Sequence, residues 1–273
     1  MGVDSEKRHD LVHARRKSAT SHRWPSIRFS KPKSHSVRRH DADYRNAYEL
    51  ALLRSAAMYL PNFLDGFDRL VAFDAETTGK RTPDAEFIRK QPFAWRAPGI
   101  IIEVGFVEML RDGEGWRKGE TWRSRVNPDG PIDPEAIKIH RIRPADLKNA
   151  PRFPTILPKV KDFVGDSPIV AHAYKNERDF LDYEFARAKV IEWGGSAYAE
   201  ERYICTQVLF AQLFPGASKS LTSMCDRLVL DSSERDDRHG ALLDADMTAD
   251  ALILLERLLK HGEPGTPRSW TST

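Results

Sequence analysis

One stretch, Val71-Ala72-Phe73-Asp74-Ala75-Glu76-Thr77-Thr78-Gly79, constrains this chain more than any other. Its apolar residues predict a β-strand, and because successive side chains of a strand point to opposite faces, Asp74 and Glu76 share one face. Two close carboxylates repel each other, and burying them is costly unless a cation compensates their charge. Oxygen ligands of this kind favour Mg²⁺ or Mn²⁺. The pair indicates either half of a metal site at a strand's end or an edge strand whose acids are merely solvated.

A second acidic position lies near the C-terminus, where His239 precedes Asp244 by five residues at the start of a predicted helix. Asp244 lies on an Ala- and Leu-rich face and has no basic partner nearby in the sequence, so a metal ion could supply the missing charge. His239 would then lie beside the ion, available as a base near neutral pH. A histidine at a helix start is also commonly a cap or a surface residue. These residues alone leave both interpretations open.

A third acidic segment, from Ile169 to Phe185, lies between the other two. It contains Glu177, Asp179, Asp182 and Glu184. Only one of these acids is needed to complete a site with the other carboxylates.

The order of the predicted elements indicates an α/β fold. Apolar runs predict three successive strands, the second over 100–110 and the third over 121–126. Helices and strands alternate after them, which gives a mixed β-sheet flanked by helices. The later elements are a loop over 127–140, helices over 154–164, 176–191 and 241–259, a strand over 168–171, and apolar segments over 204–214 and 220–228. Trp193-Gly194-Gly195 is expected to end the second of these helices, and Gly262 the last.

Charge is distributed unevenly along the chain. Residues 1–40 carry eleven Lys and Arg against three acids, a charge of +8, which leaves −5 for the rest of a chain whose formal net charge is +3. We expect a basic disordered tail over 1–45, which either keeps the protein in solution or attaches it to a polyanion. An amphipathic helix and linker over 46–64, one folded domain over 65–262 and a C-terminal tail over 263–273 complete the expected organisation.

The cysteine content indicates the compartment. Cys205 and Cys225 are the only cysteines, which favours free thiols in a reducing compartment and therefore a cytoplasmic location. No apolar run is long enough to span a membrane, so we expect no membrane association. Residues 11–40, rich in Arg and Ser, also fit an organellar transit peptide, but Trp24-Pro25 interrupts an amphipathic helix there.

Taken together, these segments resemble the DEDD 3′–5′ exonucleases of the ribonuclease H-like fold, in the branch that carries a histidine. The likeness extends over about residues 68–260 and is pronounced for the proofreading epsilon subunits of bacterial DNA polymerase III. The segments that carry it are Phe73 to Gly79, Ile101-Ile102-Glu103-Val104-Gly105, Pro131 to His140, Asp182-Tyr183-Glu184-Phe185, Phe214-Pro215-Gly216 and His239 to Ala245. Each segment is a weak signal, whereas their joint order and spacing are specific.

The resemblance implies a site and its cofactors. It matches Asp74, Glu76 and Asp244 to acids that bind two divalent ions, Mg²⁺ or Mn²⁺, and His239 to the general base. It also leads us to expect substrate contacts at a further set of residues. These are Thr77, Thr78, His140 and His172.

The middle motif departs from the family pattern. In the family, Asn usually follows the histidine, and an Asp preceded by Phe comes five residues after it. Here Ala173 follows His172, and the acid five residues on is Glu177, preceded by Asn176. We assign Glu177 as the fourth metal ligand and keep Asp179 as the competitor. The longer side chain of a glutamate puts full activity in doubt, because a displacement of about 1 Å can cost on the order of 10²-fold in rate.

The implied function is metal-dependent 3′–5′ digestion of single-stranded or frayed DNA ends that releases nucleoside 5′-monophosphates, as in proofreading or repair. Two alternatives remain: an exoribonuclease that trims RNA 3′ ends, and a catalytically weakened module that binds nucleic acid or a polymerase. The acids do not distinguish between sugars. A DNA polymerase is a candidate partner through the resemblance alone, since the sequence contains no convincing clamp-binding peptide.

The connection over 80–99 also bears on the partner. It interleaves Lys and Arg with Phe87, Phe93 and Trp95. Cations can follow the phosphates of a single strand while aromatic rings stack on its bases. The alternative is an ordinary loop whose aromatic side chains pack into the core.

Overall fold

The computed structural model describes residues 59–79, 99–192, 194–237 and 239–262. The expected basic tail over 1–45, most of the expected helix and linker over 46–64, nearly all of the connection over 80–99 and the C-terminal tail over 263–273 lie outside the described residues.

The core of the fold is a five-stranded sheet in the order β3-β2-β1-β4-β5. β1 pairs with β2 and β2 with β3 in antiparallel register, whereas β1, β4 and β5 run parallel. The strands are β1 Arg69–Thr77, β2 Ile101–Asp112, β3 Gly115–Arg125, β4 Ile169–Ala171 and β5 Tyr203–Cys205. The predicted mixed sheet is therefore confirmed, and the third strand begins six residues before the predicted Thr121 because it continues a tight hairpin from β2.

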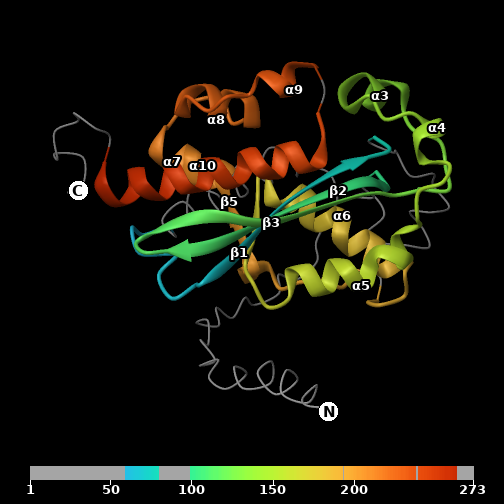
Figure 1. Cartoon of the computed structure of the whole chain (residues 1–273), viewed down its shortest axis with the longest axis horizontal. Coiled ribbons are helices and arrows are strands. Elements are labelled where there is room, and N and C mark those ends of the chain that lie inside the picture. The colour runs from blue at the N-terminus through green and yellow to red at the C-terminus, as the bar shows by residue number, and fades with distance from the viewer. Residues whose placement is uncertain (1–58, 80–98, 193, 238, 263–273) are drawn as a thin grey trace, which may run out of the picture. The chain divides into compact units, whose positions relative to one another are not determined.

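Helices cover both faces of this sheet (Figure 1). They are α3 Pro134–His140, α4 Pro144–Leu147, α5 Phe153–Val164, α6 Tyr174–Arg187, α7 Thr206–Leu213, α8 Leu221–Leu228, α9 Ser233–Asp237 and α10 Ala241–His261, with a short 3₁₀ turn, η2, at Glu200–Arg202. Even α10 is not apolar enough to cross a membrane, and neither is any other helix in the described part of the chain.

The period-two pattern of β1 divides the hydrophobic core into two layers. Leu70 and Ala72 pack with the apolar sides of α7, α8 and α10. Val71, Phe73 and Ala75 point to the other face and pack with α5 and α6. Val71, Phe73 and Ala75 therefore share one face, as the period of a strand requires. Both faces of β1 are covered, so its polar residues near Thr77 lie at the end of a buried strand.

Two regions differ from the sequence predictions. The predicted loop over 127–140 contains α3, whose N-terminus is capped by the Asp133 side chain accepting the Glu135 N–H at 2.9 Å. α6 begins at Tyr174 and ends at Arg187, so the predicted bounds of 176–191 and the proposed stop at Trp193-Gly194-Gly195 are wrong. The chain leaves the helix at Lys189, whose φ of 58° is left-handed and incompatible with further helical turns.

The segment that leads into β1 packs on the same core. Tyr59 is buried, and its hydroxyl oxygen accepts the N–H of Cys205 at 2.7 Å. Leu64 is also fully buried. Cys205 and Cys225 are both buried free thiols, as predicted.

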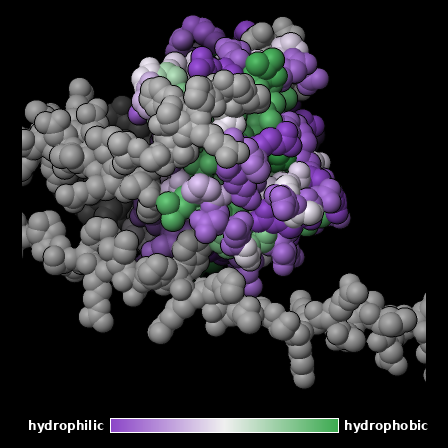
Figure 2. Space-filling view, turned by 90° about the vertical axis from the view of Figure 1, so that its left-hand side faces the viewer, coloured by the Kyte–Doolittle hydropathy of each residue, from purple (hydrophilic) through white to green (hydrophobic). Residues whose placement is uncertain are grey.

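Few large hydrophobic side chains are exposed among the described residues. On the face shown in Figure 2, hydrophilic residues predominate and hydrophobic ones form small patches. The exposed large hydrophobic residues come from separate segments: Leu60, Ile139, Val190 and Val229.

The N-terminus of α10 lies directly against β2. A Cβ atom added to Gly105 would lie 2.2 Å from the backbone carbon of Ala241, so only glycine permits this approach. Glu103, two residues earlier on β2, accepts the N–H of Ala241 at 3.1 Å and so caps a helix whose own N-cap residue, Gly240, has no side chain to do so. The start of α10 is thus fixed by the second strand.

We predict that Gly105→Ala lowers the free energy of unfolding by about 1–3 kcal/mol, because the added methyl group must push α10 away from the sheet. Gly115→Ala is the matched control, since its added Cβ would meet only the Asp112 carbonyl oxygen, at 3.8 Å. Urea unfolding of both variants measures the difference. Equal free energies of unfolding would show that the close approach of α10 to β2 does not require glycine at position 105.

Candidate functional site

Four carboxylates from three separate elements converge at the end of β1. Asp74 and Glu76 come from β1, Glu177 from the first turn of α6 and Asp244 from the first turn of α10. Burial raises the pKa of Asp74 well above its usual range, and the charges of the other three carboxylates raise it further. The structure therefore brings together the four acids that the sequence analysis singled out.

Glu76, His239 and Asp244 form the tightest part of this group. Each offers one ligand atom, and these atoms all lie within 4.8 Å of one another. Burial raises the pKa of Glu76 to about 8, with further contributions from Asp244 and Glu103. These three side chains are close enough to hold a single ion between them.

Glu177 is buried beside β1, where the backbone of Ala75 forms a hydrogen bond with its carboxylate. It is 6% exposed, and its Oε2 atom has no hydrogen-bond partner within the part of the chain that the structure describes. Burial raises the pKa of Glu177, Glu76 raises it further, and a hydrogen bond from the Ala75 backbone opposes both. Buried carboxylate oxygens normally have partners, so this one is suited to an ion that it could coordinate.

The residue that precedes α6 has a left-handed backbone conformation. Ala173 has φ 54° and ψ 49°, in the left-handed region that Asn and Gly occupy more readily than Ala. An alanine there carries a cost of about 1–2 kcal/mol. This left-handed residue directly precedes the first turn of α6, which carries Glu177.

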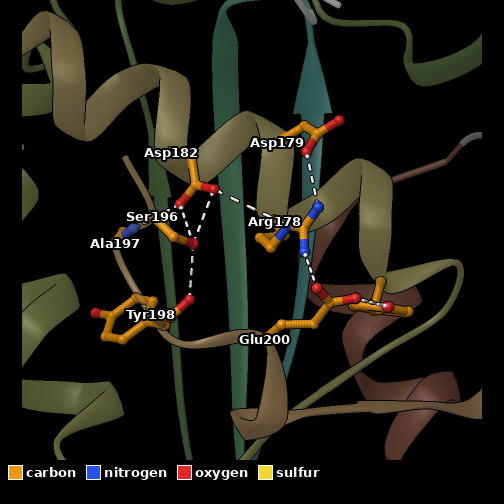
Figure 3. A network of polar contacts seen from close by, with 8 residues as sticks. Arg178, Asp179, Asp182, Ser196, Ala197, Tyr198 and Glu200 are labelled. Carbon is orange, nitrogen blue, oxygen red and sulfur yellow. Dashed lines mark hydrogen bonds and ion pairs between the residues drawn. The ribbon is translucent and has the colours of Figure 1, made fainter. Parts of the chain in front are cut away.

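Asp179, the competitor for the fourth position, belongs to a different group of contacts (Figure 3). One of its carboxylate oxygens lies 3.6 Å from the Arg178 guanidinium. Arg178 also pairs with Glu200 at 3.2 Å and, more distantly, with Asp182. Asp182 in turn accepts the N–H of Ala197 at 2.6 Å. This network joins α6 to the loop before β5 and so fixes the helix that carries Glu177.

Asp244 has a basic partner, contrary to the sequence prediction. Arg235, nine residues earlier on α9, donates from Nε to Oδ1 at 2.8 Å and from Nη2 to Oδ2 at 3.0 Å. Nη2 also lies 3.0 Å from His239 Nδ1. The prediction failed because a charged stretch before His239 gives no indication of which side chain turns inward. The folded chain supplies a cation from within its own sequence.

Two of the residues expected to contact substrate, the threonines at the end of β1, form hydrogen bonds with the backbone of the chain. Thr78 is buried, and its hydroxyl accepts the N–H of Ile100 at 3.0 Å, while its carbonyl accepts the N–H of Asp133 at 2.8 Å. Thr77 is half-buried, and its hydroxyl accepts the N–H of Gly79 at 3.4 Å. The two threonines shape the turn that follows the acidic pair.

The two histidines expected to contact substrate also lie near the site. His140 is buried, its Nδ1 accepts the N–H of Ile142 at 3.0 Å, and its pKa is lowered by burial and by nearby His239. His172 bridges Thr206 and the Lys219 carbonyl, with ring nitrogens 3.1 and 2.8 Å away, and burial lowers its pKa. Both imidazoles are thus positioned by the fold at the margins of the acidic cluster.

A hollow of about 320 Å³ opens next to His239. Arg123 and Arg125 of β3 and His140 line it, together with acids that include Glu234. Glu103 lies at its base and pairs with Arg125 at 3.6 Å. Sequence reasoning assigned no role to Glu103 or Arg235; an acid between apolar residues of β2 was the available signal for Glu103.

Comparison with known proteins agrees with this geometry. A family model described as "Exonuclease" (RNase_T) matches residues 71–252. The chain belongs to this exonuclease family. It is 30% identical over 190 residues to DNA polymerase III subunit epsilon of Haemophilus influenzae, covering 69% of this chain and 67% of that protein. The epsilon subunit of Pasteurella multocida is 31% identical over 187 residues, covering 68% of each chain.

The fold of this exonuclease is shared with solved structures. The nuclease domain of 3′hExo, described as a DEDDh family member bound to rAMP, superposes with a TM-score of 0.50 at 19% identity, covering 72% of this chain and 94% of that one. The ribonuclease H-like architecture predicted from the sequence is confirmed, as is the resemblance to the DEDDh exonucleases and the epsilon subunits. Exonucleases of this family generally use divalent metal ions.

We predict that the metal-free exonuclease becomes less stable as the pH rises from 6 to 8.5. The pKa of Glu76 is raised to about 8 on folding, so its contribution to stability is full below its ordinary value of 4.5 and is lost as the pH passes through 8. Thermal unfolding in a chelator should therefore show a shallower pH dependence for Glu76→Gln than for the wild type. Glu192→Gln, at an exposed position, is the control. If stability depends on pH equally in the wild type and both variants, the raised pKa of Glu76 is not the cause.

Proposed function

We propose that this exonuclease removes nucleotides from the 3′ end of single-stranded or frayed DNA and releases nucleoside 5′-monophosphates. The observation that carries the proposal is the convergence of Asp74, Glu76, Glu177 and Asp244 beside His239. We infer that these four carboxylates hold Mg²⁺ or Mn²⁺. Relatives named as epsilon subunits of DNA polymerase III support DNA as the substrate and proofreading or repair as the role.

The donor set is chemically suited to divalent ions. Four carboxylates, of which Glu177 and Asp244 are buried and Asp74 and Glu76 half-buried, provide hard oxygen ligands. Oε2 of Glu177, which has no hydrogen-bond partner among the described residues, is available to coordinate an ion. Bound divalent ions would lower the pKa of a water molecule and stabilise the departing 3′ oxygen. The protein's own contribution is to position the strand end and to accept the proton.

His239 is the proposed proton acceptor. Burial lowers its pKa, and the positive charge of Arg235 lowers it further, so the imidazole is neutral near pH 7. A neutral imidazole has one nitrogen able to take a proton from water. Its backbone N–H donates to the Ile139 carbonyl at 3.2 Å, which ties the base to α3.

An exoribonuclease is the alternative that a specific observation favours. The structurally similar nuclease domain of 3′hExo is described as bound to rAMP, a ribonucleotide. The carboxylates recognise a phosphodiester and do not distinguish the 2′-hydroxyl of RNA. Oligonucleotides that differ only in the sugar separate the two functions.

We predict that Asp74→Ala lowers the rate of metal-dependent digestion at least about 100-fold. Removing a residue that merely orients a metal ligand typically lowers activity about 10–100-fold, and Asp74 is proposed to be a ligand itself. Oligonucleotides labelled at the 3′ or the 5′ end, in DNA and RNA versions, report polarity and sugar preference in Mg²⁺ or Mn²⁺. The exposed Asp162→Ala is the control. Undiminished digestion by Asp74→Ala would exclude this site, and stepwise shortening from the 5′ end would exclude the proposed polarity.

The fourth ligand is tested by a pair of charge-neutralising variants. We predict that Glu177→Gln loses about 10²-fold in digestion rate, whereas Asp179→Asn changes the rate less than about twofold because it weakens a partly exposed ion pair with Arg178. Rates at saturating Mn²⁺ and thermal unfolding of both variants separate loss of activity from loss of fold. If both variants lose the same fraction of the digestion rate at equal thermal stability, the assignment of Glu177 as the fourth ligand is contradicted.

A further inference from the structure

The guanidinium of Arg235 occupies the space between two groups of the proposed site. It pairs with both carboxylate oxygens of Asp244, at 2.8 and 3.0 Å, and lies 3.0 Å from His239 Nδ1. Its third nitrogen, Nη1, donates to the Thr222 hydroxyl on α8. The side chain is 12% exposed, so these contacts are made largely away from water.

We propose that Arg235 is a built-in counter-cation of the metal-free site, and that it competes with the divalent ion for Asp244. This inference rests on the proposed function, because it assumes that the carboxylates bind metal. The positive charge of Arg235 lowers the pKa of Asp74 and Glu76 as well, so it acts on the whole cluster and not only on its direct partner.

The first argument is electrostatic. A divalent ion shared by Glu76 and Asp244 must lie close to both carboxylates, whose ligand atoms are within 4.8 Å of each other and of His239. Arg235 is within hydrogen-bonding distance of Asp244 and His239 at the same time. Like charges this close repel strongly in a buried site. The guanidinium therefore weakens metal binding while it remains in place, and the metal weakens its pairing in return.

The second argument concerns the proton that His239 must accept. A guanidinium nitrogen can only donate hydrogen bonds, so Nδ1 of His239 accepts from Arg235 and carries no proton. In the neutral imidazole, Nε2 then carries the hydrogen. Neither nitrogen is free to take a proton from water while this contact persists. Departure of Arg235 is thus required for both the metal and the base to act.

The alternative role for Arg235 predicts the opposite sign. If the guanidinium positioned Asp244 as a ligand, its removal would weaken metal binding about 10–100-fold, as for other residues that orient metal ligands. A competing cation, once removed, instead strengthens binding. The direction of the change in Mn²⁺ affinity therefore distinguishes the two roles without any measurement of activity.

The test is isothermal titration of the full chain with Mn²⁺, for the wild type, Arg235→Gln and Arg235→Lys. We expect Arg235→Gln to bind Mn²⁺ about tenfold more tightly than the wild type, with a lower melting temperature in chelator and a larger increase on adding Mn²⁺. Arg235→Lys, which keeps the charge but not the planar fork, should lie between them. Arg69→Gln is the matched control, since Arg69 pairs with Glu108 at 2.6 Å in a separate group of contacts.

Unchanged or weaker Mn²⁺ binding in Arg235→Gln would overturn the inference. If that variant fails to fold, the ¹⁵Nε signal of Arg235 in the wild type provides the second measurement. It should shift when Mg²⁺ is added, and an unmoved signal at saturating Mg²⁺ would also overturn the inference. Failure of the proposed function looks different: the wild type itself would bind no Mn²⁺, or would bind it equally well with Asp74→Ala.

Discussion

Electrostatic repulsion among four carboxylates at the end of β1 is the constraint on which the other features of this enzyme depend. Carboxylates this close, two of them buried and two half-buried, cannot all be charged without compensation. Among the described residues, the guanidinium of Arg235 compensates part of this charge, and the pKa values of Asp74, Glu76 and Glu177 are raised. The divalent ions that we propose for this site would complete the compensation, because they provide more positive charge than a single arginine can.

The fold holds the repelling groups together through packing on both faces of β1. Phe73 stacks on Phe106 of the neighbouring strand, with ring centroids 4.7 Å apart, and α5 and α6 cover this layer. The opposite face lies against α10, which approaches closely because Gly105 has no side chain. Since each acid sits on an element anchored by apolar contacts elsewhere, burial of the core offsets the repulsion at the site.

The sequence allowed a good part of this site to be predicted, for physical reasons that differ between residues. Asp74 and Glu76 follow from the period of a strand, and Asp244 from its place on an apolar helix face. Glu177 was assigned from its distance to His172 in the family motif. The bounds of α6 were predicted wrongly because its flanking left-handed residues, Ala173 and Lys189, are not the Gly or Asn that usually mark such positions. Helix α3 was missed because its start depends on a local cap more than on apolar periodicity.

Arg235 shows why the remaining part could not be predicted. Its partners are nine and four residues away, yet several charged residues surround it, and only the packed positions of α8, α9 and α10 decide which one points inward. The negative charge of the site can therefore be compensated in two ways. In one, the guanidinium of Arg235 pairs with Asp244 and occupies the lone pair of His239. In the other, which we propose, divalent ions would replace it and leave the imidazole able to accept a proton. Because both states use the same carboxylate, the pair that Arg235 forms with Asp244 offsets part of the repulsion in the absence of metal, and the base would be freed only when the ions are in place.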